Sequence, residues 1–562
     1  MVKPPPAVTD NHGMSVLPVH TAMQAARTNR ALAPSIDTPR RDTLMAVLGV
    51  CLIAVAGYAL TAAGRGFCSD DFALRKWFVE YGWLGAYAEY CRNLGINRPL
   101  GVLNILAWYG WLWPWPIAHQ LLLTLLHAVV CILLFVLVRR LTADLVAAVT
   151  AAAIFAAWHT ATCVVVWTSA GGGLLPASAG LLVALILYVR HCADHKETRY
   201  KRLSVAVFLF SVLFYDQQLG AAALFSALAL MGSPGEKTHS PLRLRLRRVV
   251  HTWPYWVVAI SVGLISVASS GNTSRPLRPG LGNLSDGFAS VLRSFWIQSV
   301  IQPIEQLRLR SGPLASLSLW AENDPMLLVL AATGVAAGCA LLWVVQRSAI
   351  DRSTTGRVGL LAVTGALLMA VTLGIMAVKP VAAVGPRHTF LPAMGVAMIA
   401  GAAFAALSRA PVKIVRRTMP IALIGIVLGL SVFRLGHVYG WTIRSQISDR
   451  VLASLATLRP DPVENELLVI DGIRKYGRGF MNSWGLSSAF SLDRGVDVRI
   501  ATVVRREADG LVANEPWDVY SWSVDAASTR FFTWDERSQR LMPSNWEQFL
   551  LAHPNLAEGK QS

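Results

Sequence analysis

Long apolar runs separated by short polar segments dominate the chain between residues 44 and 435. An α-helix needs about 20 apolar residues to cross the hydrocarbon core of a bilayer, and most of these runs approach that length. We therefore predict about eleven transmembrane helices, over residues 44–63, 117–138, 145–158, 174–189, 203–215, 219–231, 249–268, 326–345, 358–378, 391–407 and 421–435. The runs 203–215 and 219–231 are short, and they form either a broken pair or two separate spans.

Basic residues gather in alternate connections between the apolar runs. The amino-terminal segment is basic, and so are residues 139–140, 190–202, 243–248, 347–357 and 409–417. Short cytoplasmic loops of membrane proteins concentrate Lys and Arg. We therefore expect a multi-pass protein of a bacterial inner membrane, with a cytoplasmic N-terminus and, for an odd number of spans, a periplasmic C-terminus.

The composition supports this class of protein. Of 562 residues, 54% are hydrophobic and only 15% are charged, whereas a soluble domain is roughly one-quarter charged. The mean hydropathy is +0.47. The net charge of +18 is spread over short segments between apolar runs and forms no basic face, so we expect the lipid bilayer as a partner and exclude nucleic acid.

The polar segments outline three regions. Residues 1–43 are rich in Pro, Ala, Thr and Arg, which predicts a disordered cytoplasmic leader without a cleaved signal. Residues 44–437 form an all-α polytopic membrane bundle, with periplasmic loops at 67–116 and 269–324. Residues 438–562 form a small α/β extracytoplasmic domain, whose strands we predict at Glu466–Asp471, 496–504 and 519–534.

The first periplasmic loop carries two adjacent acids, Asp70 and Asp71. Neighbouring carboxylates at a membrane surface indicate a catalytic base or a metal ligand. Two acids can equally cap the N-terminus of a helix, which we predict over residues 72–81. Both interpretations stay open, and one acid can cap while the other reacts.

The same loop is dense in aromatic residues, which favour the headgroup level of a bilayer. They are Trp77, Trp83, Trp108, Trp111, Trp113, Trp115, Tyr81, Tyr87, Tyr90 and Tyr109. This density predicts short amphipathic helices along the outer surface. Cys68 and Cys91 also lie in this loop, and they are either two free thiols or a disulfide that closes a loop of about 24 residues, worth about 3 kcal/mol.

Several motifs together resemble those of the GT-C superfamily of polytopic glycosyltransferases. They are SDDF at 69–72, NRPL at 97–100, His119 and His127 spaced H-x7-H, the stretch 151–167, and GPRHTFLPAMG at 385–395. The sequence is most similar to bacterial relatives of the protein O-mannosyltransferases and of the transmembrane, TPR-containing O-mannosyltransferases. This resemblance covers most of residues 44–435.

The resemblance implies transfer of a sugar from a polyprenyl-phosphate donor to a glycan, lipid or protein acceptor on the periplasmic side, with inversion or retention of configuration. It places the catalytic carboxylate at Asp70, with Asp71 either raising its basicity or helping to bind a divalent cation such as Mg or Mn. Arg98 and Arg387, with His388, are the candidates that receive the leaving phosphate. The alternative for either arginine is snorkelling to the membrane interface.

Other basic residues are candidates for lining the site. His119 and His159 lie at the outer ends of predicted spans, and Lys379 lies in an outer turn. A histidine inside a membrane is costly and often functional, but it can also be a neutral core residue. His127 lies two turns deeper than His119, and we expect it to be structural.

Two other functions fit the same architecture. A lipid-linked glycan polymerase or ligase needs arginines for two lipid phosphates, which the segment from Arg275 to Arg310 provides. A polytopic lipid or glycan transporter is the other alternative, and it should show internal repeats and paired broken helices. We see no repeat, and the acids lie in a surface loop rather than at the midplane.

Overall fold

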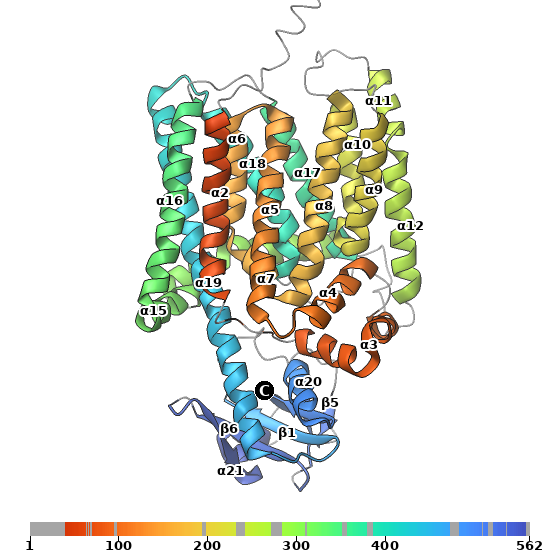
Figure 1. Cartoon of the computed structure of the whole chain (residues 1–562), viewed down its shortest axis with the longest axis vertical. Coiled ribbons are helices and arrows are strands. Elements are labelled where there is room, and N and C mark those ends of the chain that lie inside the picture. Colours follow the sequence, from red (N-terminus) through yellow and green to blue (C-terminus); the bar gives the residue numbers. More distant parts are fainter. Residues whose placement is uncertain are drawn as a thin grey trace, which may run out of the picture.

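The computed structural model of the protein describes residues 40–62, 65, 67, 70–94, 98–193, 198–231, 242–270, 284–309, 312–350, 357–378, 386–472, 483–507, 510–514, 521–525, 527–535 and 537–557. A helical bundle makes up most of the chain, and a small domain containing β-sheets stands at one end of it (Figure 1). Of the leader predicted over 1–43, residues 1–39 lie outside the described residues, whereas residues 40–43 belong to helix α2 (Arg40–Leu60), so the predicted boundary was wrong there.

Eight helices in the described ranges are long and apolar enough to cross a membrane. They are α2 (Arg40–Leu60), α5 (Pro116–Thr142), α8 (Thr168–Ala193), α12 (Trp253–Ser270) with the end of α11 (Leu242–Val250), α16 (Pro325–Ile350), α17 (Val358–Val378), α18 (Phe390–Leu407) and α19 (Lys413–Leu458). The number rises to nine if the bent pair described below counts as one span. These lengths and compositions identify a multi-pass membrane protein.

The bent pair consists of α6 (Leu145–Ala157) and a continuation formed by η2 (His159–Ala161) and α7 (Thr162–Val166), with an angle of 53° between them. Trp158, at the break, adopts an extended backbone conformation. The helix therefore ends early and resumes in a new direction.

The region 203–231, predicted as a broken pair or two spans, contains three helical pieces. They are α9 (Thr198–Phe214), η3 (Asp216–Ala221) and α10 (Ala222–Met231). Their 17 and 10 residues leave α9 and α10 shorter than a full span, although both stand beside α8 and α12 in the bundle (Figure 1). The total of eleven helices stays a prediction.

Two ends of the bundle can be distinguished. The start of α2 and helix α11 lie at one end, whereas α3 (Asp70–Leu94), α4 (Pro99–Trp111) and the sheet domain lie at the other, here called the α3 end (Figure 1). Helix α3 contains the predicted helix 72–81 and bends directly after it, because Gly82 has a φ of 68° that favours glycine. The first loop and the tail therefore share one side of the bundle.

The second predicted loop, 269–324, is largely helical where it is described. It contains α13 (Leu284–Trp296), the π-helical segment η5 (Ile297–Ile301), α14 (Gln302–Leu309) and α15 (Pro313–Asn323). Val291 and Phe295 of α13 pack against Leu373 and Met376 of α17. This packing fixes η5 beside the bundle.

Close backbone contacts hold α4, α7, α8 and α9 together. A Cβ atom on Gly101 would lie 2.3 Å from the carbonyl oxygen of Phe214, and one on Gly171 would lie 2.2 Å from that of Val164. Only glycine allows these approaches. They bring α4 and the first turn of α8 into the positions that form the candidate site.

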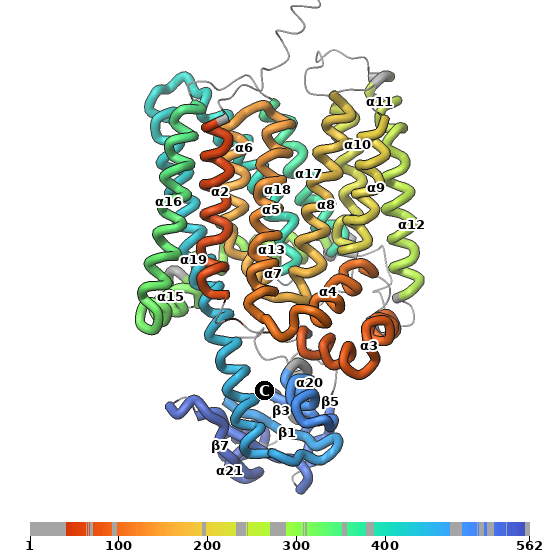
Figure 2. The backbone as a smooth tube through the Cα atoms, viewed as in Figure 1, coloured from red at the N-terminus to blue at the C-terminus, as the bar shows by residue number. Residues whose placement is uncertain are grey.

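Helix α19 does not stop at the predicted boundary between residues 437 and 438 but continues to Leu458 (Figure 2). Ile447, Val451 and Leu455, spaced by four residues, join a hydrophobic cluster with Leu468 and Phe532 of the sheet domain. The helix extends this far because residues 447–455 carry an apolar face that packs against the tail.

The tail contains two small sheets. The first has the order β2–β1–β6–β7, formed by β2 (Val498–Ala501), β1 (Glu466–Asp471), β6 (Arg530–Asp535) and β7 (Arg540–Ser544). Strand β1 is parallel to β2 and β6, and β7 is antiparallel to β6. The predicted strand Glu466–Asp471 is confirmed as β1.

The second sheet is antiparallel and contains β3 (Val503–Glu507), β4 (Gly510–Asn514) and β5 (Ser521–Ser523). The predicted strand 496–504 is therefore divided between β2 and β3, which belong to different sheets, and the predicted strand 519–534 overlaps both β5 and β6. Helices of the tail are α20 (Ser483–Arg494), α21 (Trp546–Ala552) and α22 (Pro554–Ala557).

Candidate functional site

Asp71 lies in the first turn of α3 and is only 1% exposed. Its Oδ1 accepts hydrogen bonds from the hydroxyl of Tyr109 (2.6 Å) and from the backbone N–H of Ser169 (2.8 Å). Ser169 is in the first turn of α8, where N–H groups lack partners within the helix and a negative charge is favoured. Asp71 thus caps the first turn of α8, whereas the sequence suggested a cap for the helix predicted over 72–81. Asp70 begins α3, and its side chain lies outside the described residues.

Tyr109 links the first turns of α3 to α4 through two different atoms. Its hydroxyl contacts Asp71, and its carbonyl oxygen accepts a hydrogen bond from Nη1 of Arg75 (2.9 Å). The Arg75 guanidinium also lies 5.1 Å from the ring centroid of Phe78 and 5.4 Å from that of Trp113. The hydroxyl of Tyr109 thus contacts Asp71 directly, and its carbonyl oxygen ties the same part of α3 to α4 through Arg75.

His119, a predicted site-lining residue, is fully buried in the first turn of α5. Its ring centroid lies 4.9 Å from that of Phe67 and 6.0 Å from that of Tyr109, and Phe67 stacks on Trp113 at 3.9 Å. These ring contacts place the His119 imidazole beside the Asp71–Tyr109 pair.

Arg387 and His388 lie on the short helix η6 (Pro386–Thr389) before α18. The Arg387 guanidinium is 4.9 Å from the ring centroid of Trp167, and its Nε donates to Nε2 of His388 (3.3 Å). Trp167 directly precedes α8, two residues before the Ser169 amide that contacts Asp71. Asp71 and Arg387 therefore contact the same short segment, at the entrance of α8.

Arg98 occupies the N-cap position of α4. Its Nε donates to the hydroxyl of Tyr90 (2.8 Å), and its guanidinium lies 5.4 Å from the ring centroid of Tyr215. Tyr215 directly precedes η3, from which Nε2 of Gln217 donates to the carbonyl oxygen of His388 (2.8 Å). Arg98 and the Arg387–His388 pair thus flank two connected helix entrances, η3 and η6.

His159 contacts different elements from those that surround His119. Its Nε2 donates to the carbonyl oxygen of Gln298 in η5 (3.1 Å), and its ring stacks on His437 of α19 with centroids 5.7 Å apart. The next residue, Thr160, shares a hydrogen bond of 2.8 Å with Thr389 of η6. His159 therefore reaches the site through η2 and η6 rather than through α3. The ring centroid of His127 lies 5.7 Å from that of Tyr58, and its structural role stays a prediction.

Lys379, Cys68 and the side chain of Asp70 lie outside the described residues. Cys91, the predicted partner of Cys68, is half-buried on α3. The Cys68–Cys91 disulfide therefore stays a prediction. Among the residues that the structure describes, no three His, Cys, Asp or Glu side chains form a group that could hold a metal ion. Binding of Mg or Mn by Asp70 and Asp71 also stays a prediction.

Two buried arginines beside Tyr58 were missed in the sequence. Arg65, after α2, is 2% exposed, donates Nη2 to the carbonyl oxygen of Tyr58, and leaves Nε and Nη1 without a partner. Burial lowers the pKa of Arg65 to about 9. Arg434 of α19 is fully buried, donates Nη1 to the carbonyl oxygen of Ala156 (2.6 Å), and leaves Nε and Nη2 without a partner. Arg434 had a signal, because it interrupts the apolar run 421–435.

Tyr109, Ser169 and Gln217 were also missed, and their types carry no distinctive chemical signal. The side chains that gather around the entrances of α8, η3 and η6 are a carboxylate, an imidazole and two guanidinium groups, from Asp71, His388, Arg98 and Arg387. Such a set can accept a proton and neutralise a departing anion. No protein-family model and no curated protein sequence matches this chain.

Proposed function

We propose that the protein is a membrane glycosyltransferase that transfers a sugar from a polyprenyl-phosphate donor to an acceptor at the α3 end of the bundle. The observation that carries this proposal is the buried Asp71 carboxylate at the entrance of α8. A carboxylate held in a fixed position can orient and deprotonate an acceptor hydroxyl, which is the step that sugar transfer requires. The resemblance to the GT-C superfamily places the base at Asp70 instead, whose side chain lies outside the described residues, so Asp70 stays the alternative base.

The donor phosphate is assigned to Arg98, Arg387 and His388. Arg387 lies over Trp167 beside the α8 entrance, and Arg98 lies over Tyr215 beside η3. A planar guanidinium binds two phosphate oxygens at once, and the N–H groups at a helix start add to the positive field. These groups can stabilise the lipid phosphate as the sugar leaves it.

The charge distribution supports a periplasmic location for the α3 end. Arg139 and Arg140 lie in the last turn of α5, Arg247 and Arg248 lie in the last turn of α11, and Arg409 follows α18. These elements end or lie at the end opposite to α3 (Figure 1). Because cytoplasmic loops concentrate Lys and Arg, the opposite end faces the cytoplasm, and the acceptor is a periplasmic glycan, lipid or protein.

A lipid or glycan transporter is the second candidate, and the bent pair α6–α7 favours it, because transporters often use discontinuous helices. The acid of the site argues against it. Asp71 lies on α3, at one end of the bundle, whereas transporter sites lie near the bilayer midplane. A transporter also leaves the covalent structure of its substrate unchanged, which gives a direct test.

The test is mass analysis of glycoconjugates from cells that produce the intact chain, lack it, or carry Asp71→Asn. We expect a product heavier by one sugar unit with the intact chain and its loss in the other two strains. Asp144→Asn is the matched control, because Asp144 is 2% exposed and caps α6 by accepting from the Ala147 N–H (3.0 Å) at the opposite end. This variant should keep the product.

Two outcomes would contradict the proposal. Identical glycoconjugates in cells with and without the chain exclude sugar transfer. A product that survives both Asp70→Asn and Asp71→Asn excludes these two carboxylates as the catalytic base.

The donor site can be tested with purified protein and a synthetic short-chain polyprenyl-phosphate sugar. Arg387→Lys should raise the KM for the donor, because an ammonium group loses the two-point contact of a guanidinium group with the phosphate.

A further inference from the structure

Helix α3 is held both to the bundle and to the tail by residues of its first turns. Asp71 and Arg75 fasten its first turns to Tyr109 of α4, and Asp71 also contacts the start of α8. The next residue, Lys76, forms an ion pair with Asp497 of the tail, and α20 packs against α3 beside this pair. Helix α3 therefore lies between the candidate site and the tail.

The environment of Lys76 favours its charged form. Its side chain is 20% exposed, and its Nζ also lies 3.5 Å from Oε1 of Glu80. Burial alone would lower the pKa of Lys76, but the carboxylates of Asp497 and Glu80 raise it above its ordinary value. Lys76 is thus charged at neutral pH, with an acid on its own helix and another on the tail.

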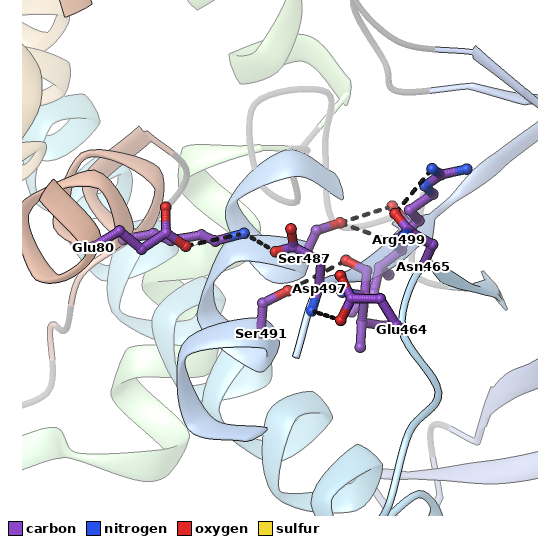
Figure 3. A network of polar contacts seen from close by, with 10 residues as sticks. Glu80, Glu464, Asn465, Ser487, Ser491, Asp497 and Arg499 are labelled. Atoms are coloured by element: carbon purple, nitrogen blue, oxygen red, sulfur yellow. Dashed lines mark hydrogen bonds and ion pairs between the residues drawn. The ribbon is translucent and has the colours of Figure 1, made fainter. Parts of the chain in front are cut away.

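Hydrogen bonds hold the backbone of Asp497 to neighbouring residues of the tail (Figure 3). Its backbone N–H donates to Oε2 of Glu464 (3.0 Å), and its carbonyl oxygen accepts from the Asn465 N–H (2.6 Å). Directly after it, the Val498 N–H donates to the hydroxyl of Ser491 in α20 (2.9 Å). The carboxylate that meets Lys76 therefore moves with α20 and the first sheet as one piece.

The tail in turn is an extension of α19. Nη2 of Arg459, just after α19, donates to both carboxylate oxygens of Glu466 in β1 (2.6 and 2.8 Å). Nη2 of Arg494 in α20 donates to the carbonyl oxygen of Ala456 (3.0 Å). Together with the apolar cluster between α19 and the sheet, these contacts leave little freedom between the tail and the bundle.

The contacts form a closed ring from the site through α3, the tail and α19 back to the bundle. The Lys76–Asp497 pair is a partly exposed ion pair in this ring, since the Lys76 and Asp497 side chains are 20% and 55% exposed. Exposed ion pairs contribute little stability and are screened by salt. We therefore expect the contact between α3 and α20 to open more readily than the other contacts in the ring.

We propose that the Lys76–Asp497 contact is a releasable clamp, and that Lys76 is a positioning residue that acts through α3 on Asp71. Closed, the clamp holds the first turns of α3 over the entrance of α8 and keeps Asp71 covered. Released, it frees these turns to move away and admits the acceptor. The step of acceptor entry rests on the proposed function, whereas the mechanical coupling does not.

The test is hydrogen–deuterium exchange of full-length protein in detergent, read on peptides that cover residues 71–81. Asp497→Lys should speed exchange there by about two- to ten-fold, because it replaces attraction by repulsion. The swap Lys76→Asp with Asp497→Lys should restore slow exchange. Arg450→Ala is the matched control, since Nη1 of Arg450 donates to Oε1 of Gln539 and so links α19 to the tail rather than to α3 (2.8 Å), and it should leave these peptides unchanged.

Unchanged exchange in Asp497→Lys overturns the clamp, and so does a swap variant that exchanges as fast as the single variant. Addition of salt gives a second measurement on the unaltered chain, and it should speed exchange of the same peptides. Neither readout needs sugar transfer. Failure of the Asp71→Asn test would therefore overturn the proposed function and leave the clamp standing, and the reverse also holds.

Discussion

The bond between Tyr109 and Asp71 gives a quantitative test of whether Asp71 carries a negative charge in the folded protein. Tyr109→Phe removes one hydroxyl and keeps the ring, which has edge contacts with Phe67 and Trp113 at centroid distances of 6.0 and 5.7 Å. The change therefore isolates the 2.6 Å hydrogen bond to Asp71. Both side chains are buried, with exposures of 0% and 1%, so bulk water cannot replace the lost donor.

The expected magnitude follows from the charge of the acceptor. A hydrogen bond to a charged group contributes about 1.5–3 kcal/mol, and a neutral one contributes about 0.5–1.5 kcal/mol. Asp71→Asn keeps an oxygen that can accept from Tyr109 and Ser169 but removes the charge. Tyr109→Phe should therefore lower the free energy of unfolding by about 1 kcal/mol more in the original chain than in the Asp71→Asn background.

The assay is equilibrium unfolding of the four proteins in mixed detergent micelles, analysed as a double-mutant cycle. An interaction of about 1 kcal/mol exceeds the 0.3–0.5 kcal/mol scatter of independent sites. Equal costs of Tyr109→Phe in both backgrounds would refute the charged hydrogen bond. Asp71 would then be a neutral packing residue, and its use as a base would lose its physical support.

Four further substitutions test the geometry, with thermal unfolding in detergent as the common measurement. Gly171→Ala places a Cβ 2.2 Å from the carbonyl oxygen of Val164 and should cost about 1–3 kcal/mol, whereas Gly425→Ala, with nothing within 4 Å, should be neutral or gain about 0.5–1 kcal/mol. Gly82→Ala should cost about 1–3 kcal/mol from backbone strain alone, because its φ is 68° and its ψ is −178° with open space around it. Arg434→Met should keep or raise the unfolding temperature, since it removes a buried charge. A large loss of stability in this variant would show that the Nη1 hydrogen bond to the Ala156 carbonyl oxygen outweighs the cost of burying the charge.

Much of the bundle could be predicted from the sequence, because an apolar run of spanning length is a local signal. The run 326–345 lies within α16, and the run 358–378 coincides with α17. The helix expected over 72–81 and the strand at Glu466–Asp471 also follow from local signals. In each case the periodicity or length within one segment determines the element.

The end of α19 could not be predicted in the same way. Beyond residue 437 the helix is stabilised by the tail, because Ile447 and Val451 pack on the sheet, and that sheet is formed by residues far along the chain. For α6, the predicted run 145–158 ends within one residue of the observed helix, but the bent continuation through η2 and α7 was not predicted.

The candidate site shows the same division between local and distant information. Motifs identified the charged groups, Asp71 and Arg387, but the partners that position them come from unrelated segments. Tyr109 and Ser169 are 38 and 98 residues from Asp71, and Ser169 contributes only a backbone N–H, which any residue except proline provides. Sequence motifs therefore reveal which groups can react, whereas the direction in which they face is set by donors without a sequence signature. For this reason the partners of Asp71 are a sharper test of the proposal than the acid itself.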